Sequence, residues 1–125
     1  KALDDIETEE SMQQYMQQLV DRFGPIPTAT LSLIDTMRIR WIANQLGAEK
    51  LVLKSGKMIL YFISKQNSPF YQSDMFTRIL EFLKHHSQEA KMYEKDNTLR
   101  MSFQQVNSVQ QALSYLEKMT TTRIN

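Results

Sequence analysis

The sequence predicts an α+β fold in which an N-terminal helical hairpin precedes two strand–strand–helix units. Three observations support this prediction. Apolar residues recur at helical spacing in two stretches before residue 47, short β-rich runs occur in pairs after residue 49, and each pair precedes another helical stretch. The four runs are expected to form one antiparallel sheet with helices packed on it. We expect an acidic lead-in over 1–10, a single domain over 11–119 and a disordered tail over 120–125.

The first helix is expected to begin at Glu9 to Ser11, with Thr8 as its N-cap, and to end at Gly24. Its apolar positions are spaced for one buried face and comprise Met12, Tyr15, Met16, Leu19 and Phe23.

The second helix is expected to be capped by Thr28 or Thr30 and to run to Leu46, with Gly47 ending it. The Gly/Pro turn between the two helices is short, so they must be neighbours in a hairpin over 11–47. The predicted inward line of the second helix is Ile39, Ile42, Ala43 and Leu46.

The remaining chain, 49–119, contains the two strand–strand–helix units. In the first unit, β-rich runs at 51–53 and 58–63 flank a turn, and Ser73 or Asp74 caps the helix that follows. In the second unit, runs at 90–93 and 99–103 precede a helix capped by Asn107 or Ser108.

Composition limits the possible functions. The 125 residues carry 15 basic and 14 acidic side chains, so the net charge of +1 creates no global field that attracts nucleic acid or a membrane. The absence of cysteine excludes disulfides and thiolate chemistry and fits a reducing compartment. No stretch approaches the roughly 20 apolar residues of a membrane span. The sequence starts at Lys1 without an initiator methionine, which indicates a piece of a longer protein.

Residues that could perform chemistry are sparse. The three glycines are too far apart for a phosphate-binding loop. The two histidines, His85 and His86, are adjacent and point about 100° apart on a helix, so they share no metal-binding face. No serine lies in a Gly-x-Ser-x-Gly context, and a hydrolase has no positive feature in its favour. We therefore expect no catalytic, cofactor-binding or metal-binding residues and no small-molecule substrate, and we expect the chain to bind a protein surface.

Two groups of side chains suggest binding sites. Met37 and Trp41 lie beside the inward line of the second helix, where they either widen the buried face or form an exposed anchor for a protein contact. The alternative function is nucleic-acid binding through basic residues near an aromatic ring. Against it, Arg38 and Arg40 point about 200° apart on a helix. The residues of this alternative are Arg38, Arg40, Trp41 and the hairpin lysines Lys50, Lys54 and Lys57.

The segment Leu19-Val20-Asp21-Arg22-Phe23-Gly24-Pro25-Ile26-Pro27, with Leu46-Gly47 after it, resembles one family. It is similar to the C-terminal domain of the bacterial transcription-repair coupling factor (Mfd), over about residues 6–53. The resemblance implies a cytoplasmic parent that is an ATP-dependent DNA translocase, removes stalled RNA polymerase and recruits excision-repair proteins. It implies that this domain is a non-catalytic clamp that packs on a UvrB-like module of the same parent and masks the UvrA-binding surface.

The residues of the motif have predicted roles. Asp21 and Arg22 are expected to be a solvated flank, Phe23 a core plug, Gly24 a left-handed helix end and Pro27 a helix stop. The candidates for the interdomain contact lie on the exposed face of the first helix and are Gln14, Gln17, Gln18 and Asp21. A polar interface of modest size suits a contact that must open.

Overall fold

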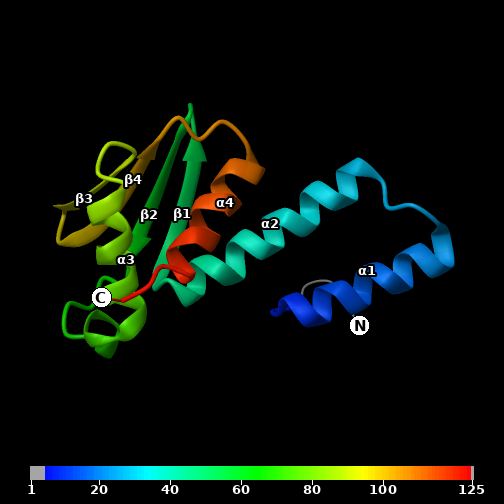
Figure 1. Cartoon of the computed structure of the whole chain (residues 1–125), viewed down its shortest axis with the longest axis horizontal. Helices are drawn as coiled ribbons and strands as arrows, with labels where there is room; N and C mark the ends of the chain where they lie inside the picture. Colours follow the sequence, from blue (N-terminus) through cyan, green and yellow to red (C-terminus); the bar gives the residue numbers. More distant parts are fainter. Residues whose placement is uncertain (1–4, 125) are drawn as a thin grey trace.

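The structure, a computed structural model, describes residues 5–124 and has the predicted α+β architecture. A four-stranded antiparallel sheet of order β1-β2-β4-β3 is covered on one face by helices, and a helical hairpin extends to one side of it (Figure 1). The elements are α1 (Glu9–Phe23), α2 (Thr28–Gln45), β1 (Ala48–Lys54), β2 (Lys57–Phe62), the 3₁₀ helix η2 (Pro69–Gln72), α3 (Asp74–His85), β3 (Ala90–Lys95), β4 (Thr98–Gln104) and α4 (Val109–Thr120).

Side-chain caps start three of the four α-helices. The Thr8 hydroxyl accepts a hydrogen bond from the Ser11 amide at 3.1 Å, as predicted. Ser73 caps α3, and Ser108 caps α4. The predicted threonine cap of α2 is wrong, because α2 follows Pro27 directly and has no side-chain cap. The Pro27 carbonyl accepts the first backbone bonds of α2, and the proline ring presets the entry into the helix.

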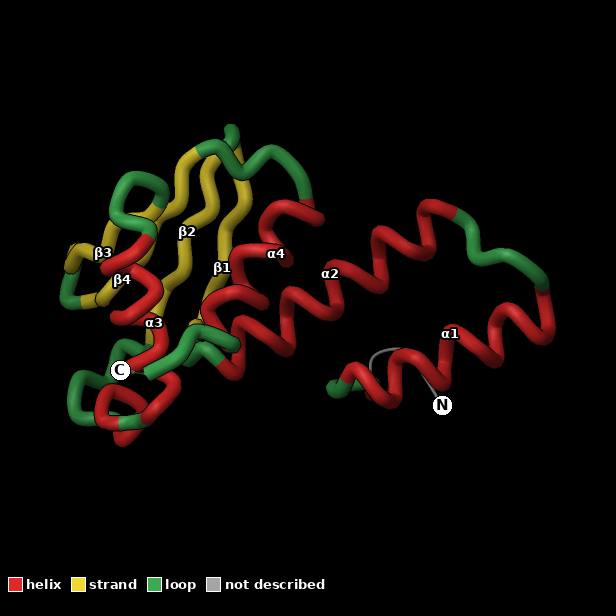
Figure 2. Tube along the Cα trace, viewed as in Figure 1, coloured by secondary structure: helices red, strands yellow, loops and turns green. Residues whose placement is uncertain are grey.

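The main core lies between the sheet and helices α2, α3 and α4 (Figure 2). Alternate residues of β2 and β4 point into it, and register pairs Met58 with Phe103 and Leu60 with Met101. All four are fully buried. The predicted inward line of α2 is confirmed, since Ile39, Ala43 and Leu46 are buried in this core and Ile42 packs against it.

A second, smaller core holds α1 to α2. It consists of Ile6, Met12, Ile34, Met37 and Trp41, with Tyr15, Met16 and Ile42 packed against it. Ile42 contacts both cores, so α2 has apolar side chains on two sides. Ile6 is 2% exposed and therefore ties down part of the predicted lead-in, whose residues 1–4 lie outside the described range.

The C-terminal end is more ordered than predicted. Thr120 closes α4, and the hydroxyls of Thr121 and Thr122 donate to the carbonyls of Glu117 and Lys118 at 3.0 and 2.7 Å. The prediction of a disordered tail from residue 120 is therefore wrong for these three threonines. These hydroxyls add hydrogen bonds to carbonyls of the last turn of α4, and the Glu117 carbonyl also accepts the Thr121 amide. Asn125 lies outside the described residues.

The link between α2 and β1 depends on Gly47. Its φ of +77° is in the region that favours glycine. A Cβ at this position would lie 2.6 Å from ring carbons Cε1 and Cε2 of Phe70. Phe70 in turn stacks on Phe62 of the main core, with ring centroids 6.3 Å apart. The turn between α2 and β1 therefore packs directly against the Phe70 ring, which leaves no room for a side chain at position 47.

We predict that Gly47→Ala destabilises the chain by about 2–4 kcal/mol, because backbone strain and overpacking act together. Urea denaturation followed by circular dichroism measures this loss. Adding Phe70→Leu to Gly47→Ala should recover part of it, which a double-mutant cycle reports as coupling. Strictly additive effects of the two substitutions would contradict the contact.

Candidate functional site

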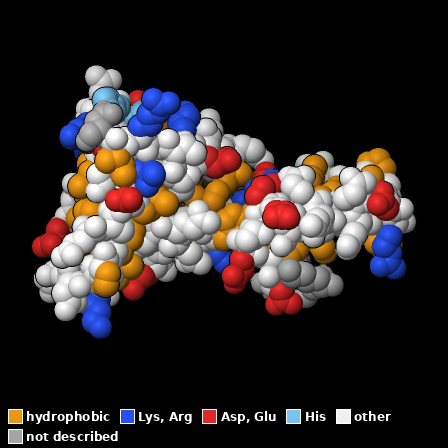
Figure 3. Space-filling view, turned by 60° about the horizontal axis from the view of Figure 1, so that its bottom comes forward, with side chains coloured by type: hydrophobic (Ala, Val, Ile, Leu, Met, Phe, Trp, Pro, Cys, Tyr) orange, Lys and Arg blue, Asp and Glu red, His pale blue; other side chains and the backbone are white. Residues whose placement is uncertain are grey.

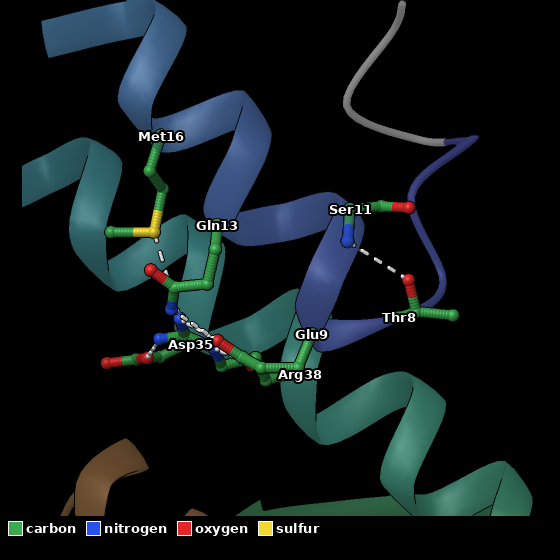
Figure 4. A network of polar contacts seen from close by, with 7 residues as sticks. All are labelled: Thr8, Glu9, Ser11, Gln13, Met16, Asp35 and Arg38. Atoms are coloured by element: carbon green, nitrogen blue, oxygen red, sulfur yellow. Dashed lines mark hydrogen bonds and ion pairs between the residues drawn. The ribbon is translucent and has the colours of Figure 1, made fainter.

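The candidate site is the helical hairpin, and an ion-pair cluster fixes the two helices to each other (Figure 4). The Arg38 guanidinium on α2 donates to Glu9 on α1 twice, from Nε to Oε1 and from Nη2 to Oε2, both at 2.8 Å. Its Nη1 donates to Asp35 at 2.9 Å. A bidentate arginine–carboxylate pair has a defined geometry, so this cluster fixes the position of the first turn of α1.

The charges of the cluster shift the acid–base behaviour of Glu9. Burial alone would raise the pKa of this carboxyl group. Hydrogen bonds from Arg38 and Gln13, together with the charge of Arg38, outweigh burial and hold the pKa below its ordinary value. The Arg38 pKa is raised, chiefly by the hydrogen bond to Glu9. Both directions favour the ionised pair in the folded state.

Met37 and Trp41 belong to the interior of the hairpin. Their exposed fractions are 4% and 9%, and both lie in the small core that α1 covers. The interpretation of these residues as a widened buried face is confirmed, and their expectation as an exposed protein contact is wrong. The buried stripe of α2 is wider than its inward line because α1 covers a second side of the helix.

The other four contact candidates form a continuous polar face on α1. Gln14, Gln17, Gln18 and Asp21 are all exposed, and their spacing of three and four residues aligns them along one side of the helix. The Gln17 amide donates to the Asp21 carboxylate at 2.9 Å, which orders two of the four side chains. We call these four residues the α1 outer face.

The free end of the hairpin exposes apolar side chains. Phe23 is 74% exposed, so its prediction as a core plug is wrong. It continues the apolar stripe of Met12, Met16 and Leu19, of which Met12 is buried and the other two are half-buried, but it is the last residue of α1. A shallow apolar pocket of about 240 Å³ surrounds it, lined by Leu19, Phe23, Gly24, Pro25, Ile26, Pro27 and Thr30.

The turn residues of the motif explain this geometry. Gly24 has a positive φ of 82°, as expected, but its ψ of −158° is outside the left-handed helical region. Pro27 is extended and precedes α2 rather than stopping α1. Asp21 and Arg22 are solvated, as predicted. The space-filling view shows apolar and charged side chains together at the free end of the hairpin (Figure 3).

The α1 outer face and Phe23 point in different directions. Phe23 follows Gln14 by nine residues, which places it about 180° around the helix. A partner that contacts both must therefore wrap the end of α1. We call Phe23 and its surrounding pocket the hairpin tip.

Over residues 5–124, no three side chains of His, Cys, Asp or Glu gather as metal ligands. His86 is stacked on Phe82 with ring centroids 4.0 Å apart, and its Nδ1 lies 2.9 Å from the Phe82 carbonyl oxygen. Within the same residues, no helix is both long and apolar enough to cross a membrane.

The residues of the nucleic-acid alternative do not assemble into one site. Arg38 is engaged by Glu9 and Asp35, and Trp41 is buried, so neither is available to phosphates or bases. Arg40 is exposed on α2. Of the lysines of the first strand hairpin, Lys50 lines a pocket together with Arg40, whereas Lys54 and Lys57 pair with each other at the turn end of the hairpin.

Comparisons with known proteins agree on one group. The sequence profile of the TRCF domain family matches residues 1–73 of this chain. The transcription-repair-coupling factor of Rickettsia bellii (strain RML369-C) is 28% identical over 96 residues, which are 77% of this chain and 8% of that protein. The chain thus spans a small part of the length of this curated relative.

A crystal structure of the C-terminal domain of transcription-repair coupling factor is similar in fold. Its TM-score is 0.71 at 15% identity, over 92% of this chain and 72% of that chain. At this identity the likeness concerns the fold alone.

We predict that Arg38→Gln loosens α1 and lowers stability at neutral pH by under about 1 kcal/mol, since the Glu9 side chain is 53% exposed. The folded-state pKa of Glu9 is lowered, so its contribution is present above the unfolded-state pKa and is lost as the pH falls through the folded-state value. The stability gap between the two proteins should therefore close on acidification. Urea titrations at a series of pH values measure this gap.

Arg22→Gln is the matched control, because Arg22 is exposed on α1 and its guanidinium lies over the Phe23 ring rather than on a carboxylate. This variant should match the unmodified chain across the pH series. A gap for Arg38→Gln that is independent of pH would contradict the assigned role of Glu9.

Proposed function

Because the chain belongs to the TRCF domain family, we propose that it is a non-catalytic regulatory domain of a transcription-repair coupling factor. In this proposal the hairpin packs on a UvrB-like module of the same parent protein and masks the surface that binds UvrA. Release of the hairpin would then permit UvrA binding during transcription-coupled repair.

The observation that carries this proposal is that α1, the outer helix of the hairpin, extends away from the sheet (Figure 1) and carries exposed polar and apolar side chains. Protein interfaces combine an apolar, aromatic centre with a polar rim. The hairpin tip supplies an aromatic ring that is 74% exposed, and the α1 outer face supplies amide and carboxylate groups.

The rigidity of the hairpin also supports the proposal. The ion-pair cluster of Arg38 and the small core hold α1 in place before any partner arrives. A preformed surface loses little conformational entropy on binding, so a small contact can suffice. A contact with a polar face remains weak enough to open, which a switch requires.

The parent's activities belong to the same proposal. An ATP-dependent translocase motor and the sites for DNA and RNA polymerase would lie in other parts of the parent, since this chain corresponds to 8% of its relative. The chain itself would contribute neither ATP hydrolysis nor a bound cofactor.

We predict that Asp21→Arg weakens binding of the chain to the UvrB-like module at least about tenfold, or about 1.4 kcal/mol. Asp21 is the one charge of the α1 outer face and holds Gln17, so reversal removes both features. Isothermal titration calorimetry measures the affinity. Glu117→Arg on α4 makes the same charge change on an exposed residue outside the hairpin and should leave the affinity unchanged.

Phe23→Ala tests the hairpin tip in the same assay. A side chain this exposed should affect stability by under about 0.5 kcal/mol, so a loss of affinity in this variant would report on binding and not on folding. In a competition experiment, UvrA is added to a fusion protein in which the UvrB-like module is tethered to this chain. The unmodified chain should slow UvrA binding, and Asp21→Arg should restore it. Equal UvrA binding with and without the tethered chain would refute the masking function.

A further inference from the structure

The sheet has a second face, opposite the helices, whose side chains the proposed function does not use. Helices α2, α3 and α4 lie on the other side (Figure 2). Strand register assigns alternate residues to this face, since paired residues share a side. We call it the outer sheet face, and its main residues are Lys50, Val52, Lys54, Lys57, Ile59, Tyr61, Lys91, Tyr93, Lys95, Arg100 and Ser102.

This face concentrates positive charge. Six of the chain's fifteen basic side chains lie on it, and Asp96 is the carboxylate at its margin, 3.6 Å from Arg100. The rest of the chain is left with nine basic and thirteen acidic side chains. Asp96 lies in the β3–β4 turn, and the two acidic residues within the strands are directed elsewhere: Glu49 accepts the Ser64 amide at 3.3 Å, and Glu94 is paired with Leu99 on the helix-covered side. A net charge of +1 therefore conceals a strongly basic surface.

One row of this face alternates cations and aromatic rings across all four strands. Lys50 pairs with Tyr61, Tyr61 with Arg100, and Arg100 with Tyr93. The Lys50 ammonium lies 5.2 Å from the centroid of the Tyr61 ring, and the Arg100 guanidinium lies 4.7 Å from it. Tyr93 ends the row with 37% of its surface exposed. The Tyr61 ring thus holds one cation from the edge strand β1 and one from the central strand β4.

Arg100 keeps unused hydrogen-bonding capacity. Its Nε is buried and has no partner among the described residues. Its contact with Asp96, at 3.6 Å, is longer than the roughly 2.7–2.9 Å of a charge-assisted hydrogen bond. Because Nε is covered, a ligand would reach Arg100 through its terminal guanidinium nitrogens, whose contact with Asp96 is long. A phosphate group has the charge and the acceptor oxygens that a guanidinium binds best.

We propose that the outer sheet face binds single-stranded nucleic acid. The lysines and Arg100 would contact successive phosphates, and Tyr93 would stack on a base. Lysine is depleted in the centres of protein interfaces, so a face with five lysines favours phosphate over a protein partner. The face measures roughly 15 by 20 Å, which fits a few nucleotides of one strand. This surface is separate from the hairpin, so the inference does not depend on the proposed function.

The test uses fluorescence anisotropy of the whole chain with fluorescein-labelled oligothymidylate, oligouridylate and a mixed-sequence duplex, each about 15 nucleotides long. We expect micromolar binding of a single strand at about 50 mM salt, weakening steeply toward about 200 mM. Each phosphate contacted contributes about −0.7 to the slope of log affinity against log salt. A preference between the two single strands identifies whether DNA or RNA is bound.

Variants distinguish binding at the outer sheet face from attraction by the overall charge of the chain. The double variant Lys91→Gln and Lys95→Gln should weaken binding of the single strand at least about tenfold. It should also make the slope of log affinity against log salt shallower by about 1.4. Arg22→Gln with Lys118→Gln removes the same charge from α1 and α4 and should leave both quantities unchanged. Tyr93→Ala should weaken binding about tenfold, whereas Tyr93→Phe, which keeps the ring, should retain it. Circular dichroism verifies that each variant folds.

Three outcomes would overturn the proposal. The first is no binding of either single strand at about 50 mM salt with about 100 µM protein. The second is equal weakening by the sheet-face and control pairs, which would make binding a property of overall charge. The third is displacement of the oligonucleotide by poly-glutamate at equal concentration, which would identify an acidic protein as the partner.

Discussion

Helix α2 packs on two separate cores, and the rest of the structure depends on this constraint. One side of α2 closes the main core through Ile39, Ala43 and Leu46, and the other receives α1 through Ile34, Met37 and Trp41. Among residues 5–124, the main core contains sixteen buried residues and the second core contains five. The shared helix makes the hairpin and the sheet one body, with Gly47 and Phe70 fixing the turn between them. A hairpin anchored in this way can present the exposed side of α1 to a partner while both helices stay fixed relative to the sheet.

Local signals in the sequence predicted most of the fold, and tertiary contacts decided what they missed. Thr8 is a helix cap in any context, because the hydroxyl needs only the amide three residues ahead. Thr28 and Thr30 carry the same chemistry, yet Pro27 began α2 without them. Phe23 follows the apolar period of α1 but is its exposed last residue, which periodicity does not reveal. The Glu9–Arg38 pair joins residues 29 positions apart, so no local pattern indicated it.

The two exposed surfaces have different chemistry and lie on different elements. The hairpin offers amides, one carboxylate and an apolar tip, which suit a protein that must be released. The outer sheet face offers cations and tyrosines, which suit phosphate and bases. Its basic row was only partly visible in the sequence, because Lys50 and Tyr93 lie far apart in the chain and meet through the pairing of four strands. A single scaffold can thus carry a protein contact and a nucleic-acid contact without a catalytic group in either.

The account's central claim is that α1 is a preformed docking surface held by α2. Amide hydrogen exchange of the chain, free and bound to the UvrB-like module, tests it most directly. The account predicts that α1 is already protected in the free chain, and that binding adds protection to Glu9–Phe23 and the following turn but not to the strands. Rapid exchange of α1 in the free chain, or new protection confined to the sheet, would contradict it.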